Sequence, residues 1–288
     1  MPANGKILDT IDSLYDSLTK TEKKIAKTIL SNPQLLNQAS LSAIAVDLDV
    51  GEATFIRFCR TLGFKGFTDF KMDLAIELAT QDKSETTLLD TDVTVEDSAQ
   101  NIALKLQAVI NNVITETMNL LDFKELEKVV KAFRQAKRIF LFGVGSSGIT
   151  AEDAKNKFMR IGLQMDAATN NHFMYMQASL MQKGDVVMGI SHSGYSQETT
   201  HALGIAHKAG ATTIALTHNL RSPITRVADL VLINGHRQGQ MQGDSIGTKI
   251  AQLFVLDLIY ALIVQAEEEK ATKTKQKTLN VILEQRIK

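Results

Sequence analysis

Residues 137–148 read KRIFLFGVGSSG, an apolar run followed by a turn rich in glycine and serine. Similar apolar runs follow at 184–191, 212–217 and 229–234, and a weaker one lies at 161–169. Segments of helical length separate these runs. Strands that are apolar throughout and alternate with helices are typical of a parallel sheet covered on both faces. The pattern therefore predicts a doubly wound, five-stranded parallel α/β sandwich within residues 105–288.

Long helices are expected around this sheet, at 98–120, 123–135 and 246–266. The last is strongly apolar, so we expect it to cover the sheet or an oligomer interface. The charged residues after it, 267–288, include one more stretch with helical character, VILEQRI.

The first 80 residues differ, because apolar side chains recur there at three- and four-residue spacing and no β-rich run interrupts them. Thr19 and Glu22 form a capping-box pattern at the start of one helix. Residues 81–100 hold six acidic side chains and one Lys, which predicts an acidic linker over 81–104. The expected fold is therefore α/β with an all-α N-terminal domain over 1–80.

Composition excludes several classes of protein. The 288 residues include 32 Lys and Arg against 32 Asp and Glu, and this zero net charge excludes indiscriminate coating of nucleic acid or membrane. A single cysteine, Cys59, excludes a disulfide scaffold, and the histidine spacing predicts no metal site. No run of 18 apolar residues and no signal-peptide core occurs, so we expect a cytoplasmic protein without a membrane partner.

Residues 41–74 predict two short helices joined by the tight turn Asp49-Val50-Gly51, which is the plan of a helix-turn-helix motif. The apolar face of the first helix comprises Leu41, Ile44, Ala45 and Leu48, and that of the second comprises Ala53, Phe55, Ile56, Phe58 and Leu62. A plain helical bundle is the alternative explanation.

The second of these helices carries side chains suited to DNA. We expect Thr54, Arg57 and Arg60 to contact bases or phosphates, with Lys65 and Lys71 near the phosphate backbone. Residues 51–71 have a net charge of +2, whereas residues 1–80 have a net charge of −1. Any attraction to DNA is therefore expected to be local and sensitive to salt.

This segment resembles the N-terminal domain of the RpiR family of bacterial transcription regulators. The resemblance rests on the string ATxxRFCxxLGFxGFxxFK, from Ala53 to Lys71. Gly51 stands where the family usually has Ser, and Gly caps a helix less well by about a few tenths of a kcal/mol. The resemblance implies a regulator whose partner is double-stranded operator DNA.

Two polar turns follow predicted strands. GVGSSG at 143–148 opens a helix, so its amides, its glycines and the hydroxyls of Ser146 and Ser147 suit a phosphate. SHSGYSQET at 191–199 supplies five more hydroxyls. Both turns would emerge at the carboxyl edge of a parallel sheet, where they could hold one compact phosphate.

GVGSSG also fits the dinucleotide pattern GxGxxG, and Asp166 follows Gly148 by 18 residues, near the place of a ribose-binding acid. An NAD-binding sensor or dehydrogenase is therefore one alternative, and SHSGYS as an ordinary polar turn is another.

Residues 125–265 resemble the sugar isomerase (SIS) domain, through GVGSS at 143–147 and SHSGYS at 191–196. The resemblance implies that Ser147, Ser191, Ser193 and Ser196 bind phosphate, with Ser196 in place of the more usual Thr. His172 falls where family regulators often have a histidine near the sugar, and Lys249 is a further candidate ligand. For both, an ordinary surface role is the alternative.

The stretch HRQGQMQGDSIGTKIAQL, residues 236–253, is similar to regulators of sialic acid and amino-sugar catabolism. It implies N-acetylmannosamine 6-phosphate or glucosamine 6-phosphate as effector, with no other cofactor. Because SIS domains commonly dimerise, a homodimer or a tetramer that pairs two DNA-binding heads is expected.

The predicted function is therefore a sugar-phosphate-responsive regulator, and specifically a repressor, of a carbohydrate or amino-sugar catabolic operon, and not an enzyme. Isomerisation needs a positioned base, whereas Glu152, Asp153 and Glu198 near the turns are explained as acids in the first turns of helices. A sugar-phosphate aldose–ketose isomerase remains the main alternative.

Overall fold

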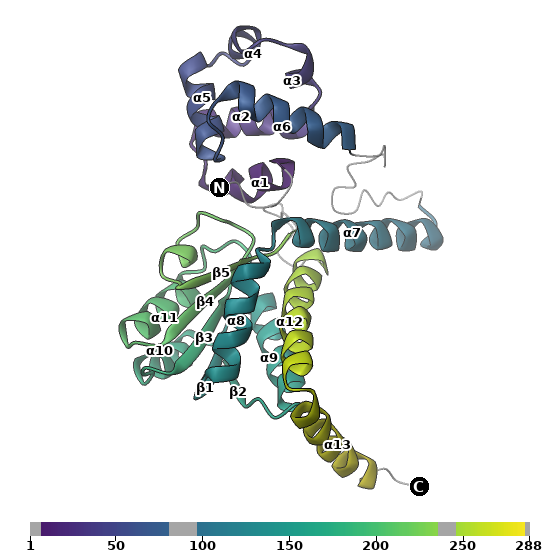
Figure 1. The fold of residues 1–288 in the computed structure, drawn as a ribbon, viewed down its shortest axis with the longest axis vertical. Helices are drawn as coiled ribbons and strands as arrows, with labels where there is room; N and C mark the ends of the chain where they lie inside the picture. Colours follow the sequence, from purple (N-terminus) through teal and green to yellow (C-terminus); the bar gives the residue numbers. More distant parts are fainter. Residues whose placement is uncertain (1–6, 81–96, 236–245, 286–288) are drawn as a thin grey trace.

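The computed structural model describes residues 7–80, 97–235 and 246–285. The N-terminal domain is helical, as predicted, and packs around one apolar cluster (Figure 1). Its elements are α1 (Ile7–Leu14), η1 (Tyr15–Ser17), α2 (Lys20–Ser31), α3 (Leu35–Gln38), α4 (Leu41–Asp47), α5 (Glu52–Thr61) and α6 (Phe67–Thr80). Phe55, Phe58 and Phe70 are fully buried, and their rings meet edge to face. The capping box of Thr19 and Glu22 is confirmed at the start of α2.

The α4–turn–α5 unit has the predicted helix-turn-helix form. Ser40 caps α4, Asp49 takes the left-handed conformation in the turn (φ 46°), and Gly51 begins α5 without a side-chain cap. The expected position of Ala53 on the buried face is wrong, because Ala53 is exposed. The helix packs inward through Phe55 and Phe58, and the first turn of α5 stands away from the core.

The second domain contains a five-stranded sheet in the order β2-β1-β3-β4-β5, and every pair of neighbours is parallel. The strands are β1 (Arg138–Phe142), β2 (Met165–Ala168), β3 (Asp185–Ile190), β4 (Thr212–Thr217) and β5 (Leu230–Ile233). All five lie within the predicted segments. The α/β fold with a parallel five-stranded sheet is thus confirmed.

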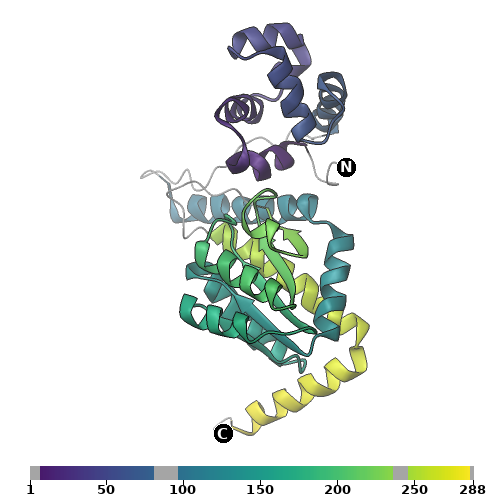
Figure 2. The ribbon, with the colours of Figure 1, turned by 90° about the vertical axis from the view of Figure 1, so that its left-hand side faces the viewer.

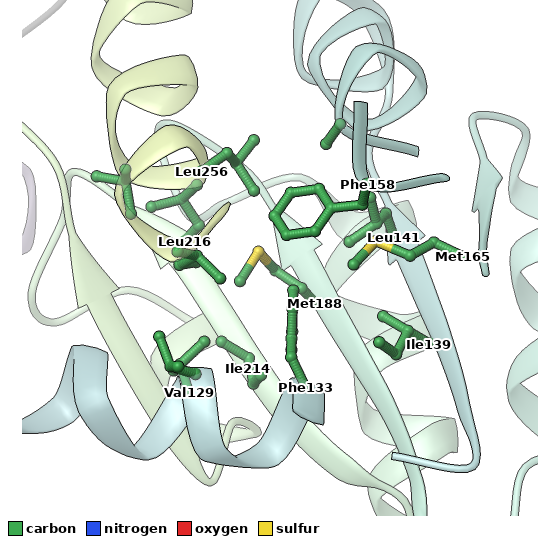
Figure 3. Packing of buried hydrophobic residues seen from close by; sticks show 14 of the residues in the cluster. Val129, Phe133, Ile139, Leu141, Phe158, Met165, Met188, Ile214, Leu216 and Leu256 are labelled. Carbon is green, nitrogen blue, oxygen red and sulfur yellow. The ribbon is translucent and has the colours of Figure 1, made fainter. Parts of the chain in front are cut away.

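Helices cover both faces of the sheet (Figures 1 and 2). On one face lie α8 (Phe123–Gln135), α9 (Gly145–Met159) and α12 (Ile246–Ala266), where Phe133, Phe158 and Leu256 pack against Met188 (Figure 3). On the other lie α10 (Asn171–Ser179) and α11 (Gln197–Lys208). Alternate side chains of each strand point to opposite faces, so the sheet is apolar on both sides, as its sequence indicates.

Helix α12 occupies the predicted range. Among the described residues it is the one helix long and apolar enough to cross a membrane, but Val255, Leu256 and Ile259 are buried in the core of the sheet domain. Packing therefore accounts for its apolar character. Helix α13 (Glu268–Glu284) follows, and the end of the VILEQRI stretch lies outside the described residues.

Helix α7 (Ala99–Leu120) begins inside the segment predicted as linker, 81–104. The side chain of Ser98 caps it by accepting a hydrogen bond from the backbone N–H of Asn101. The capping serine therefore starts a helix within the stretch whose acidic composition predicted a linker. Residues 81–96 lie outside the described residues.

The amino edge of the sheet holds an ion pair between the exposed Arg138 and the buried Asp185, at 2.5 Å. The hydrogen bond from the Arg138 guanidinium lowers the pKa of Asp185, whose side chain is fully buried. A carboxyl with a lowered folded-state pKa contributes stability above its unfolded pKa and loses it as pH falls through the folded value.

We therefore expect Arg138→Ala to lower the free energy of unfolding at pH 7 by about 1–2 kcal/mol, because the buried carboxylate of Asp185 loses its charged partner, although solvent screens the exposed part of Arg138. The difference between variant and wild type should begin to shrink as pH falls below about 4, the ordinary pKa of an aspartate, and should be lost as pH falls through the lower folded-state pKa of Asp185. Urea unfolding at pH 7 and pH 3 measures both effects. The exposed Arg160→Ala is the matched control, and equal stability of the two variants at pH 7 would contradict the prediction.

Candidate functional site

The two polar turns lie side by side, as predicted. Strand β1 pairs with β3, so the β1 loop (residues 143–148) and the β3 loop (residues 191–196) leave neighbouring strands at the same edge of the sheet. This carboxyl edge is where parallel α/β sheets bind ligands.

The β1 loop is compact because it contains glycines at two crowded positions. A Cβ atom at Gly143 would lie 2.8 Å from the backbone oxygen of Ser147, and one at Gly148 would lie 2.8 Å from the oxygen of Gly143. Helix α9 starts within the loop at Gly145 (φ 57°), so its first amides are presented at the sheet edge. Free amides at a helix N-terminus suit an anion.

Buried polar atoms gather where α9 meets α12. Gln252 Nε2 donates to Ser147 Oγ at 3.1 Å, and both side chains are buried. Three more buried atoms, Ser146 Oγ, Thr248 Oγ1 and Gln252 Oε1, have no hydrogen-bond partner among the described residues. Since a buried polar group without a partner is costly, this cluster indicates a place that a polar ligand completes.

Thr248 and Gln252 were missed in the sequence. The signal that could have found them is their spacing, because these two polar residues lie one helical turn apart in a mainly apolar helix. The predicted neighbour Lys249 lies in the same turn of α12 and is half-buried.

The β3 loop holds its serines by local hydrogen bonds. Ser191 is buried and its Oγ accepts from the N–H of Gly194 at 3.2 Å, while exposed Ser193 accepts from the N–H of Tyr195 at 3.2 Å. Within the described residues neither hydroxyl donates a hydrogen bond, so each keeps its hydrogen for an anion. Ser196 has a further role, because it caps α11 and donates to Glu198.

The turn in the β3 loop depends on Gly194, which takes φ 71° and would place a Cβ 2.0 Å from Ser222 Oγ. We expect Gly194→Ala to destabilise the folded protein by about 1–3 kcal/mol through strain and to weaken anion binding at the loop. Thermal unfolding and calorimetry measure the two effects.

Gly204→Ala is the matched control for this substitution. Gly204 lies inside α11, and an added Cβ would meet only Val227 Cγ1 at an ordinary 3.8 Å. Alanine is the better helix former, so we expect this variant to be as stable as the wild type or more so. Equal destabilisation by both substitutions would contradict the argument from loop geometry.

His172 lies in the first turn of α10, directly after β2, and is exposed. Because β2 also pairs with β1, His172 and the serine loops share the carboxyl edge of the sheet. Neither His172 nor Lys249 makes a side-chain hydrogen bond within the described residues, so their roles toward a ligand stay predictions.

The structure weakens the two alternative functions. Asp166 lies two residues before the end of β2, and its carboxylate accepts from Gln177 Nε2 and lies 3.8 Å from Lys155 Nζ. It is thus engaged away from the strand end where a ribose-binding acid is expected. Glu152 also pairs with Lys155, but its expected place in the first turn of a helix is wrong, because it lies in the middle of α9.

No group of three or more His, Cys, Asp or Glu side chains in the described ranges is placed to hold a metal ion. Cys59 is fully buried in the helical core, and burial raises the pKa of its thiol to about 12. Its role there is packing.

The predicted DNA-binding residues divide into two groups. Arg57, Arg60 and Lys65 are exposed, and Arg57 Nη2 donates to Thr54 Oγ1 at 3.1 Å, which orders the half-buried threonine beside it. Lys71 differs, because its Nζ donates to the backbone oxygen of Ala39 at 2.9 Å and lies over the ring of Phe67. Lys71 is therefore tied into the domain.

A helix-turn-helix domain with exposed arginines, followed by a parallel α/β domain with a hydroxyl-lined edge, is the architecture of a ligand-sensing transcriptional regulator. Residues 5–81 match the helix-turn-helix domain of the rpiR family, and residues 132–279 match the SIS domain.

Similar proteins agree with both matches. An HTH-type transcriptional regulator from Haemophilus influenzae is 65% identical over the full length of both chains. The regulator RpiR of Escherichia coli is 28% identical over 91% of this chain and 88% of its own. The structure of Vibrio vulnificus NanR complexed with ManNAc-6P is similar over 98% of this chain and 100% of that one, with a TM-score of 0.63 and 25% identity. The chain belongs to the RpiR family of transcriptional regulators that carry a SIS domain.

Proposed function

We propose that this regulator binds a sugar phosphate at the carboxyl edge of its sheet and changes its affinity for operator DNA in response. The observation that carries the proposal is the cluster of buried Ser146, Thr248 and Gln252 atoms without partners beside the serine loops. A phosphorylated sugar offers both the anion that the loops suit and the hydroxyls that the cluster would pair with.

Different residues of the site would bind the phosphate and the sugar of the ligand. Ser147, Ser191 and Ser193 donate to the phosphate, together with the amides of α9. Because Gln252 already donates to Ser147 Oγ, the hydroxyl hydrogen of Ser147 remains for the ligand. Ser146 and Ser196 line the same loops, and His172 and Lys249 approach the sugar from α10 and α12.

N-acetylmannosamine 6-phosphate is our leading effector, with glucosamine 6-phosphate second, because the similar NanR structure contains ManNAc-6P. The proposed role is repression of an amino-sugar or sialic acid catabolic operon in the cytoplasm. Residues 236–245, which carried part of the resemblance, lie outside the described residues.

DNA binding is assigned to residues 1–80, joined through 81–104 to the sensor domain 105–288. Arg57 and Arg60 would read bases, with Thr54 beside them, and Lys65 would contact phosphate. Lys71 would act mainly by holding the domain together. A homodimer or tetramer would place two such heads on the half-sites of one operator.

The test combines calorimetry with operator binding. N-acetylmannosamine 6-phosphate, glucosamine 6-phosphate and NAD(H) are titrated into the full chain, and DNA from upstream of its own gene is titrated with and without the best binder. Binding of a sugar phosphate that changes operator affinity supports the proposal. Preferential binding of NAD(H), or NMR-detected turnover between aldose and ketose, would replace it with one of the alternatives.

A further inference from the structure

A loop of the sensor domain reaches the DNA-binding domain at α1. This β4 loop, residues 218–222, follows β4 at the carboxyl edge of the sheet, and α1 lies between that edge and the rest of the helical domain (Figure 1). Ser13 Oγ donates to the backbone oxygen of His218 at 2.5 Å, and both residues are buried. His218 Nε2 also lies 3.7 Å from Oδ2 of Asp12, the residue before Ser13 in α1.

The same loop also contacts the recognition helix α5. Leu220 packs against the apolar cluster of the helical domain. Arg221 Nη2 donates to the backbone oxygen of Thr61, the last residue of α5, at 2.9 Å. A cation at a helix C-terminus is favourable, so this contact holds the end of the helix that carries Arg57 and Arg60.

On its other side the β4 loop is bound to the β3 loop. The backbone N–H of His218 donates to the backbone oxygen of His192 at 2.9 Å, and Thr217 Oγ1 donates to the same oxygen at 3.0 Å. The rings of His192 and His218 are stacked, with centroids 5.3 Å apart and planes at 20°. His192 stands between Ser191 and Ser193, the two serines assigned to the phosphate.

We propose that the stacked pair His192–His218 couples occupation of the phosphate site to the position of the DNA-binding domain. One residue, His218, touches the β3 loop through its N–H and ring and touches α1 through its carbonyl oxygen and imidazole. An anion drawn in by Ser191 and Ser193 acts on the residues that flank His192, so an adjustment of the loop is transmitted to α1. This inference rests on the proposed function of the β3 loop.

A packing role for the two rings is the competing explanation, and His192 distinguishes the two. The ring of His192 stacks on His218, which contacts α1 through its carbonyl oxygen and its imidazole. If the rings merely fill space within the sensor domain, substitution of His192 does not change hydrogen exchange in α1. If they couple the domains, α1 loses protection when either ring is removed.

Hydrogen exchange of residues 7–14 in the full chain, without ligand or DNA, tests the coupling. We expect His192→Ala and His218→Ala to speed exchange in α1 by about two- to tenfold, the range that the loss of one stacked ring pair supports. His192→Phe keeps a stacking ring and should restore protection. His201→Ala, which removes an exposed histidine from α11, is the matched control and should leave α1 unchanged.

A second measurement connects the pair to regulation. The ratio of operator Kd with and without saturating N-acetylmannosamine 6-phosphate is compared between wild type and His192→Ala. We expect the ratio to fall toward one in the variant while calorimetry still detects the sugar phosphate, since coupling and binding are separate free energies.

The outcomes separate this inference from the proposed function. Unchanged α1 exchange in His192→Ala overturns the coupling and leaves the sugar-phosphate function untouched, because that measurement uses neither ligand nor DNA. A wild type that does not bind sugar phosphates overturns the proposed function, while faster α1 exchange in both alanine variants still establishes the mechanical link between the domains.

Discussion

The double substitution Ser191→Ala and Ser193→Ala should weaken binding of N-acetylmannosamine 6-phosphate by at least about 100-fold. Each serine keeps its hydroxyl hydrogen within the described structure, and a hydrogen bond to a charged group contributes about 1.5–3 kcal/mol. Two such bonds lost together give about 3 kcal/mol or more. Isothermal titration calorimetry on the full chain measures the change.

Controls separate loss of ligand contacts from collapse of the loop. Ser191 Oγ also accepts from Gly194, so the unfolding midpoint of the double variant must be measured, and Ser193→Ala alone should reproduce part of the loss with little effect on stability. Ser179→Ala removes an exposed hydroxyl on α10 that donates only to its own helix. A stable double variant with wild-type affinity would show that the phosphate binds elsewhere.

Arg57→Ala is expected to weaken operator binding by about 5- to 150-fold, because a bidentate arginine–guanine contact contributes about 1–3 kcal/mol. Arg57 is exposed on the face of α5 that carries Thr54, to which it donates a hydrogen bond. The fold should therefore survive the change. Fluorescence anisotropy at physiological salt measures affinity, and circular dichroism checks the fold.

Two further variants identify what Arg57 contributes. Arg57→Lys keeps the charge and loses the planar fork, so it should restore little affinity if the arginine reads a base and most of it if the arginine only contacts phosphate. Lys27→Ala removes one exposed charge from α2 in the same domain and should cost less. Equal losses of operator affinity from Arg57→Ala and Lys27→Ala would show that Arg57 contributes only general electrostatic attraction.

The amino-acid sequence was sufficient to predict the main helices and strands and their order along the chain. Strands β1, β3 and β4 each contain an apolar run, and helices such as α2 begin at capping residues, so local patterns identify both. The adjacency of the two serine loops also followed from the sequence. Parallel strands release their loops at one edge, and residues next to strand ends must then lie there.

Local patterns could not show which side chains of separate elements meet. Gln252 reaches Ser147 across 105 positions only because α12 packs against α9 on the sheet. Lys71 matched the family string, yet its ammonium group binds the backbone at Ala39, because α6 lies against the end of α3. Such contacts depend on how helices pack, which periodicity does not specify.

The sequence by itself determined a helix-turn-helix domain, a doubly wound sheet and a pair of serine loops, because each depends on residues close together in the chain. Only the tertiary structure decided how the two domains touch. Ser13 and His218 are 205 positions apart, and their contact exists because α1 docks on the carboxyl edge of the sheet beside the loops assigned to the ligand. That docking arises from complementary surfaces of two finished domains, so no single stretch of sequence encodes it.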